Sequence, residues 1–85
     1  MKAAWIVYIL RCADDTLYTG ITNDLKNRLA MHESGKGAKY LRGRTPFTLA
    51  YTETHPDKST ALKREIQIKG LDRNSKLALC ITKKC

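Results

Sequence analysis

The sequence predicts a single α+β domain over residues 1–85, and three observations indicate this class. Three short segments are rich in β-branched and aromatic residues, as strands are: residues 5–10, 17–21 and 47–53. Two further segments combine apolar residues at helical spacing with residues that begin or end helices: residues 24–34 and 59–70. A chain of 85 residues is long enough for one domain with one modest core.

The first strand is expected in WIVYIL, an apolar run typical of a strand buried on both faces. The turn CADDT joins it to LYTGI, which predicts a hairpin. Alternation divides the first run into two faces: Ile6, Tyr8 and Leu10 on one, Trp5, Val7 and Ile9 on the other. Tyr18 and Gly20 also share a face, so Tyr8 and Tyr18 point the same way if the register brings them together. Core packing is the alternative role for both tyrosines.

A helix over residues 24–34 follows, with Asn23 as its expected N-cap and Gly35 as its end. Its apolar stripe is given by Leu25, Leu29 and His32, with Arg28 beside them. The next stretch, GKGAKYLRGRTP, holds three glycines, one proline and four basic residues. This composition predicts a basic loop with one helical turn at residues 38–42.

The second predicted helix, residues 59–70, has an apolar face and a polar edge: Ala61, Leu62 and Ile66 on the face, Glu65 and Lys69 at the edge. Asp72 is expected to cap a last segment, RNSKLALCI at residues 73–81. The letters LALCI in this segment fit a helix or a strand, so its type stays open.

Charge and cysteine content restrict the partners and the compartment. Sixteen Lys and Arg against eight Asp and Glu give a net charge of +8, which favours nucleic acid because bound phosphates release counterions. A solvated lysine surface is the alternative. Cys12, Cys80 and Cys85 form no C-x-x-C pair, as expected for reduced thiols in a cytoplasmic protein. The apolar run near the start is too short for a membrane span or a signal peptide, so no membrane partner is expected.

Several side chains could carry out chemistry on a phosphodiester. Arg28 and His32 are four residues apart on one predicted helix, so their side chains can converge. A carboxylate such as Glu65 can hold Mg²⁺ against phosphate oxygens, a guanidinium can stabilise charge on a phosphoryl group, and a tyrosine or histidine can accept a proton from water. Each residue also has a structural alternative, such as an ion pair between Glu65 and Lys69.

Taken in order along the chain, these residues resemble the GIY-YIG nuclease superfamily, and in particular its small stand-alone bacterial branch. Its signature tripeptides fall on Ile6-Val7-Tyr8 and Tyr18-Thr19-Gly20, and its Arg, His and Glu fall on Arg28, His32 and Glu65. The resemblance extends from about Trp5 to Ile81 and includes GKGAKYLRGRTPFTLAY. Many members carry an Asn downstream of the Glu. The only candidate here is Asn74, to which no role is assigned.

The resemblance implies a central three-stranded antiparallel sheet flanked by helices, and a divalent-metal-dependent endonuclease that hydrolyses DNA. It implies that Tyr8 and Tyr18 line the active site, that one of them or His32 is the general base or orients the water, and that Arg28 contacts the scissile phosphate. Glu65 would bind a single Mg²⁺ or Mn²⁺. Gly20 would have a structural role, allowing a close approach. The branch is also similar to the catalytic part of nucleases acting on branched DNA, which suggests DNA repair or recombination.

Two other functions stay open at this stage. One is a basic nucleic-acid-binding module without effective catalysis, whose binding falls steeply with salt but needs no metal. The other is a subunit that needs a protein partner for targeting. For the nuclease and for the binding module, the expected nucleic-acid contacts come from the basic loop: Lys36, Lys39, Tyr40, Arg42 and Arg44. Tyr40 would stack on an unpaired base.

Overall fold

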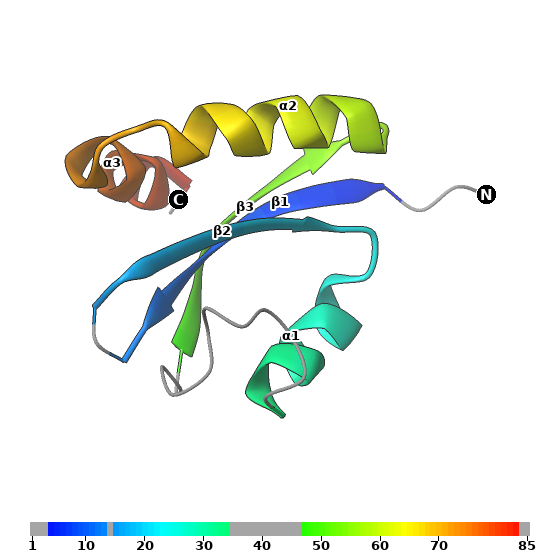
Figure 1. Cartoon of the computed structure of the whole chain (residues 1–85), viewed down its shortest axis with the longest axis horizontal. Helices are drawn as coiled ribbons and strands as arrows, with labels where there is room; N and C mark the ends of the chain where they lie inside the picture. Colours follow the sequence, from blue (N-terminus) through cyan, green and yellow to red (C-terminus); the bar gives the residue numbers. More distant parts are fainter. Residues whose placement is uncertain (1–3, 14, 35–46, 84–85) are drawn as a thin grey trace.

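A three-stranded antiparallel sheet lies at the centre of the fold, as Figure 1 shows. The computed structural model describes residues 4–13, 15–34 and 47–83. The sheet has the order β2-β1-β3. Its strands are β1 (Trp5–Cys12), β2 (Leu17–Thr22) and β3 (Phe47–His55). The α+β class and the antiparallel sheet expected from the sequence are confirmed, although β3 is longer than expected because it pairs with β1 from Trp5 to Cys12.

Three helices cover the two faces of this sheet: α1 (Leu25–Glu33), α2 (Lys58–Lys69) and α3 (Arg73–Lys83). In Figure 1, α2 and α3 lie on one side of the sheet and α1 on the other. The last segment, which fitted a helix or a strand, is therefore a helix. The helical turn expected at residues 38–42 lies outside the described residues. None of the helices in the described ranges has the length and apolar character needed to cross a bilayer.

The alternation of β1 divides the core into two layers, as the sequence predicts. Val7 and Ile9 are fully buried beneath α2, where they pack with Ala61 and Ile68. The other layer lies toward α1. It is formed by buried Tyr8, Leu10 and Cys12 together with Ile6, Tyr18, Leu25, Leu29 and Phe47. Tyr8 thus belongs to a core layer, and its chemistry depends on what its hydroxyl contacts.

Local hydrogen bonds set the helix ends, and one expected cap is wrong. The N-cap of α1 is Asp24, not Asn23: the Asp24 side chain accepts a hydrogen bond from the backbone N–H of Asn27. Asp24 is held there because its own N–H donates to the hydroxyl of Thr22. At the start of α3, Asp72 accepts from the N–H of Ser75 at 2.8 Å, so the expected Asp72 cap is confirmed.

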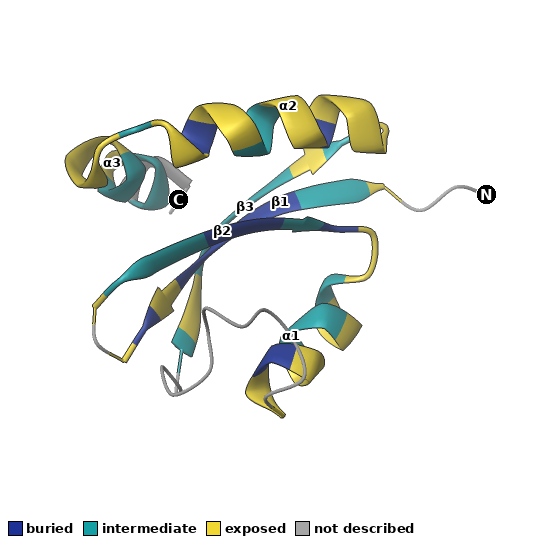
Figure 2. Cartoon of the chain, in the orientation of Figure 1, coloured by how far each residue is buried: buried dark blue, intermediate teal, exposed yellow. Residues whose placement is uncertain are grey.

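The expected apolar face of α2 is also wrong in part. Ala61 and Ile68 are fully buried, but Leu62 is 42% exposed and Ile66 is 64% exposed. Figure 2 shows this division, with buried positions on the side of α2 that faces the sheet and exposed positions on the other sides. The small Ala61 allows a close approach to the sheet, and Ile68 lies two turns later on the same side. Leu62 and Ile66 are turned away as a result.

Candidate active site

The side chain of Tyr8 lies directly over Gly20 on the neighbouring strand. The two residues are paired in the β1–β2 register, and Leu10 is paired with Tyr18. A Cβ atom at position 20 would lie 2.6 Å from the Tyr8 hydroxyl oxygen and 2.7 Å from Cζ. The close approach at Gly20 is therefore made by the Tyr8 ring, and glycine is needed there because any side chain would displace that ring.

The Tyr8 ring carries its hydroxyl across β2 to His32 of α1. The Tyr8 oxygen lies 3.0 Å from His32 Nε2, and each residue is only 2% exposed. Tyr18 packs edge-on against His32 with ring centroids 5.7 Å apart, and Phe47 of β3 packs edge-on from another side. His32 is held in an aromatic cage that fixes its ring, as a buried histidine with a defined task requires.

Burial sets the protonation states of this pair. Burial raises the pKa of Tyr8 far above its ordinary value of 10.0, with Tyr18 and Glu65 adding to the rise and Arg28 opposing it. Burial also lowers the pKa of His32 below its ordinary value of 6.5, and the nearby charge of Arg28 lowers it further. At neutral pH, Tyr8 is thus a protonated phenol and His32 a neutral imidazole.

Arg28 and Glu65 approach the tyrosine from opposite helices. Arg28 lies one turn before His32 on α1, and Glu65 is carried by α2 with 14% of its side chain exposed. Both charges affect the pKa of Tyr8, so both lie within electrostatic range of its hydroxyl. Of the five residues singled out from the sequence, Tyr8, Tyr18 and His32 are therefore in contact, and Arg28 and Glu65 act on Tyr8 through their charges.

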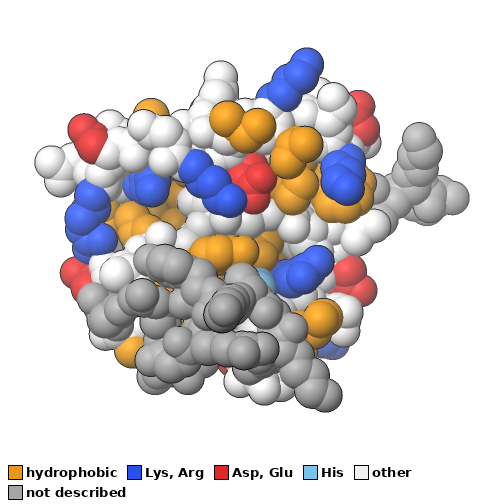
Figure 3. Space-filling model, in the orientation of Figure 1, with side chains coloured by type: hydrophobic (Ala, Val, Ile, Leu, Met, Phe, Trp, Pro, Cys, Tyr) orange, Lys and Arg blue, Asp and Glu red, His pale blue; other side chains and the backbone are white. Residues whose placement is uncertain are grey.

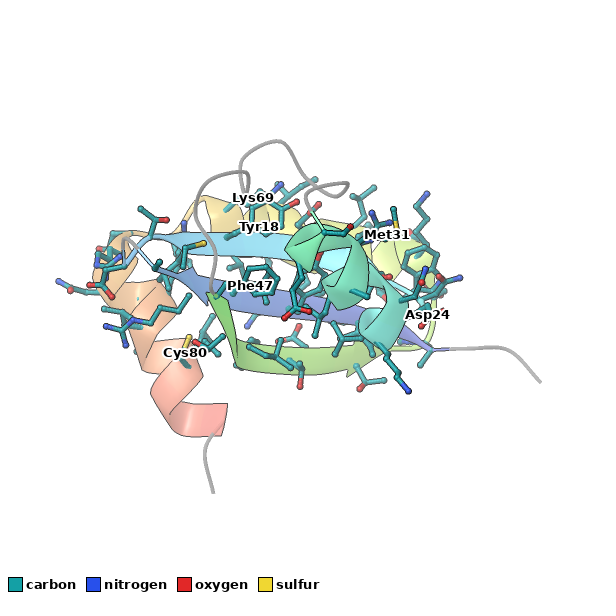
Figure 4. All side chains as sticks on the ribbon, turned by 90° about the horizontal axis from the view of Figure 1, so that it is seen from below. Tyr18, Asp24, Met31, Phe47, Lys69 and Cys80 are labelled. Carbon is teal, nitrogen blue, oxygen red and sulfur yellow. The ribbon has the colours of Figure 1, made fainter. Side chains whose placement is uncertain are left out.

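This cluster lies at the β2 edge of the sheet, with Tyr8 and His32 buried and Glu65 partly exposed. Figure 3 shows an acidic side chain on α2, hydrophobic side chains over β2, and a histidine beside a Lys or Arg side chain on the same face. Figure 4 looks at the sheet from the side of α1, and there Tyr18 and Lys69 both lie toward β2. Lys69 Nζ is 3.3 Å from a Glu65 carboxylate oxygen, so the ion pair given as the structural alternative for Glu65 is present.

The Glu65 carboxylate suits a divalent cation that takes only one or two of its ligands from the protein. Within the described ranges, no group of three His, Cys, Asp or Glu side chains could hold a metal ion. Mg²⁺ does not need such a group, because it binds through one or two carboxylates and completes its shell with water and phosphate oxygens. One partly exposed carboxylate whose charge reaches Tyr8 is compatible with that chemistry.

Asn74 and the basic loop do not enter the described cluster: no role was assigned to Asn74, and the loop lies outside the described residues. Asn74 is exposed in the first turn of α3, and no described contact joins it to Glu65. The loop residues expected to contact nucleic acid lie outside the described residues: Lys36, Lys39, Tyr40, Arg42 and Arg44. Their proposed contacts remain predictions.

A second polar cluster, which we call the β3 cluster, was not expected from the sequence. It consists of Tyr51, Glu53 and His55 on one face of β3 and Arg64 on α2. Tyr51 donates to Glu53, His55 Nε2 lies 2.6 Å from the same carboxylate, and Arg64 Nε lies 3.0 and 3.2 Å from its two oxygens. The alternation YTETH could have indicated a shared face, but nothing in it points to Arg64, eleven residues after Glu53.

Comparisons with known proteins show the family of this chain. The GIY-YIG catalytic domain family matches residues 4–78. A UPF0213 protein of Oceanobacillus iheyensis is 58% identical over 73 residues, covering 86% of this chain and 85% of the relative. A UPF0213 protein of Natronomonas pharaonis is 53% identical over 76 residues, covering 89% of each chain.

Two solution structures share the fold. The UPF0213 protein BH0048 of Bacillus halodurans has a TM-score of 0.62 at 46% identity, covering 94% of this chain and 85% of that one. The protein EF2693 of E. faecalis has a TM-score of 0.68 at 37% identity, covering 95% of this chain and 86% of that one. The family implies nuclease activity on a nucleic-acid substrate. This chain belongs to the GIY-YIG catalytic domain family.

Proposed function

We propose that this protein is a divalent-metal-dependent endonuclease that hydrolyses phosphodiester bonds in DNA at the β2 edge of its sheet. The observation that carries the proposal is the contact of Tyr8 with His32 across Gly20, within range of Arg28 and Glu65. A sheet core alone does not need a tyrosine hydroxyl bonded to a neutral histidine between an arginine and a carboxylate. Hydrolysis of a phosphodiester does need a proton acceptor and positive charge beside it.

Tyr8 and His32 form a proton relay in this proposal. In the Nδ1–H tautomer, His32 Nε2 accepts the proton of the Tyr8 hydroxyl. The Tyr8 oxygen then accepts a proton from the water that attacks phosphorus, while its own proton passes to His32. The new bond to phosphorus replaces the bond to the leaving sugar oxygen, which takes up a proton from solvent. The neutral His32 favoured by burial is the form that this step requires.

Arg28 and Glu65 act on the phosphate. The Arg28 guanidinium would donate hydrogen bonds to the non-bridging oxygens as negative charge builds on them. Glu65 would hold the metal ion, Mg²⁺ or Mn²⁺, which when bound supplies further charge stabilisation at the phosphate. Tyr18 packs against His32 and holds it toward Tyr8.

A binding module without catalysis is the second candidate, and one observation favours it. Lys69 Nζ lies 3.3 Å from Glu65, so the carboxylate has a cationic side chain as a neighbour. In this alternative the face binds phosphates through its basic side chains, and binding depends on salt but not on metal.

The test is a cleavage assay on branched, single-stranded and duplex DNA in Mg²⁺ and in Mn²⁺. Glu65→Gln is compared with Glu33→Gln, which removes the same charge from an exposed position at the end of α1. Metal-dependent cleavage that is lost only in Glu65→Gln supports the proposal. Equal binding by all three proteins without cleavage supports the binding module.

We further propose a cytoplasmic role in DNA repair or recombination, with a protein partner for targeting.

A further inference from the structure

An exposed apolar stripe runs along α2 beside the candidate catalytic carboxylate. Leu62 is 42% exposed and Ile66 is 64% exposed, and they bracket Glu65 in sequence. With Lys58 and Lys69 they are spaced i, i+4, i+8 and i+11, which places all four on one side of the helix. We call these four residues the α2 stripe. In Figure 3, hydrophobic and basic side chains gather over α2 around an acidic one.

Single exposed apolar residues are normal on protein surfaces, but the α2 stripe lies beside Glu65, the carboxylate proposed to act on the phosphate. Any phosphate that reaches Glu65 brings its neighbouring nucleotides within about one helical turn of Leu62 and Ile66. The two lysines at the ends of the stripe, on a chain of net charge +8, favour a polyanion over a second copy of the same basic chain.

We propose that the α2 stripe holds an unpaired base next to the phosphate at Glu65, so that the substrate is single-stranded or locally unpaired at the site. This inference rests on the proposed function and narrows its substrate class. Leu62 and Ile66 offer no hydrogen bonds to phosphates, but aliphatic side chains pack on base faces and insert between unstacked bases. In an intact duplex those faces are covered by neighbouring base pairs, whereas an unpaired base exposes them. Lys58 and Lys69 would contact the flanking phosphates.

The experiment measures DNA binding by fluorescence anisotropy in EDTA, so that no cleavage occurs. One labelled strand is used alone and in its complementary duplex. Leu62→Ala/Ile66→Ala is compared with the wild type and with Leu49→Ala, whose leucine is 44% exposed on β3. We expect the double variant to bind the single strand about fivefold more weakly and the duplex less than about twofold more weakly. Leu49→Ala should bind both as the wild type does.

Equal affinity of double variant and wild type for the single strand would overturn the inference, and so would an equal loss on both DNAs. Sedimentation of the wild type and the double variant gives a third outcome. If the wild type is a dimer and the double variant is a monomer, the α2 stripe is an interface between two copies of the chain, and this also overturns the inference. If the wild type cleaves DNA in a Glu65-dependent way while the double variant binds unchanged, only this inference fails. If the wild type binds neither DNA, the proposed function fails with it.

Discussion

Two polar clusters on opposite edges of the sheet contain the same four residue types but differ in how these are connected. At the β2 edge, Tyr8 contacts His32, while Arg28 and Glu65 lie nearby. At the β3 edge, Tyr51, His55 and Arg64 all converge on the carboxylate of Glu53. The β3 cluster thus satisfies its carboxylate within the protein. At the β2 edge, Glu65 forms an ion pair with the exposed Lys69.

This difference distinguishes the β3 cluster, which is satisfied within the protein, from the cluster at the β2 edge, for which we propose catalysis. A carboxylate with three donors is already satisfied, so it joins β3 to α2 and has little capacity for a ligand. Glu65 has oxygen lone pairs that a cation or a water molecule can use. The same side-chain types therefore suit a stabilising role at one edge and, in our proposal, catalysis at the other. The predictions below substitute matched residues at the two edges, beginning with the largest expected effect.

Replacement of the two arginines should give opposite results. Arg28→Ala should lower the cleavage rate by about a hundredfold, because a positive charge at the phosphate is lost, with little change in stability. Arg64→Ala should retain cleavage but lower the free energy of unfolding by about 1–2 kcal/mol, because it removes a charged donor from Glu53. Cleavage rates and urea unfolding of both variants measure this. Equal loss of cleavage in both variants would contradict the assignment of different roles to Arg28 and Arg64.

Gly20→Ala should disturb the β2 edge through packing. Its Cβ would lie 2.6 Å from the oxygen of the buried Tyr8, so the ring must shift away from His32. We expect the free energy of unfolding to fall by about 1–3 kcal/mol, together with a loss of cleavage. Gly70→Ala is the control, because a Cβ there has no neighbour nearer than 3.5 Å and φ is −81°. If both variants unfold alike, the close contact of Tyr8 with Gly20 is wrong.

The β3 cluster should make the free energy of unfolding depend on pH in the acidic range. Burial raises the pKa of Glu53, but hydrogen bonds from Tyr51, His55 and Arg64 outweigh it and hold the pKa below its ordinary value of 4.5. Its contribution is therefore present above that value and is lost as the pH falls through the lowered pKa. Glu53→Gln should be about 1–2 kcal/mol less stable at pH 7, and the gap should close in acid. Urea unfolding from pH 7 to pH 3 measures the gap. A constant gap would contradict the ionised cluster.

The smallest expected effect concerns two threonines of β2 that are each 3% exposed. The Thr19 hydroxyl is buried and has no hydrogen-bond partner among the described residues, whereas the Thr22 hydroxyl accepts from the N–H of Asp24. Thr19→Val should raise the free energy of unfolding by about 1 kcal/mol, and Thr22→Val should lower it by a similar amount. Thermal unfolding distinguishes the two. A destabilised Thr19→Val would show that its hydroxyl has a partner.

The sequence was sufficient for most of the fold because the relevant signals are local. The apolar run of β1, the turn before β2 and the capping residue Asp72 each act within a few residues. The orientation of α2 depends on its contacts with the sheet, which involve residues distant in sequence. The pattern predicts Ala61, Leu62 and Ile66 together on the buried face, but only the small Ala61 fits where the helix approaches the sheet.

The site residues were identified by their order along the chain, since spacing alone allowed a structural alternative for each. The contact of Tyr8 with His32 could not be predicted, because it depends on the β1–β2 register and on the missing side chain at Gly20. The β3 cluster was missed for a similar reason. It joins a strand and a helix through the long side chain of Arg64, and no residue pattern specifies that pairing.

The most direct test of the account replaces two tyrosines by phenylalanine, one at each edge. Tyr8→Phe removes the hydroxyl that contacts His32, and Tyr51→Phe removes the hydroxyl that donates to Glu53. We expect metal-dependent DNA cleavage to fall by at least about a hundredfold in Tyr8→Phe and to stay at the wild-type rate in Tyr51→Phe. Unimpaired cleavage by Tyr8→Phe, or equal loss in both variants, would contradict the assignment of catalysis to the β2 edge.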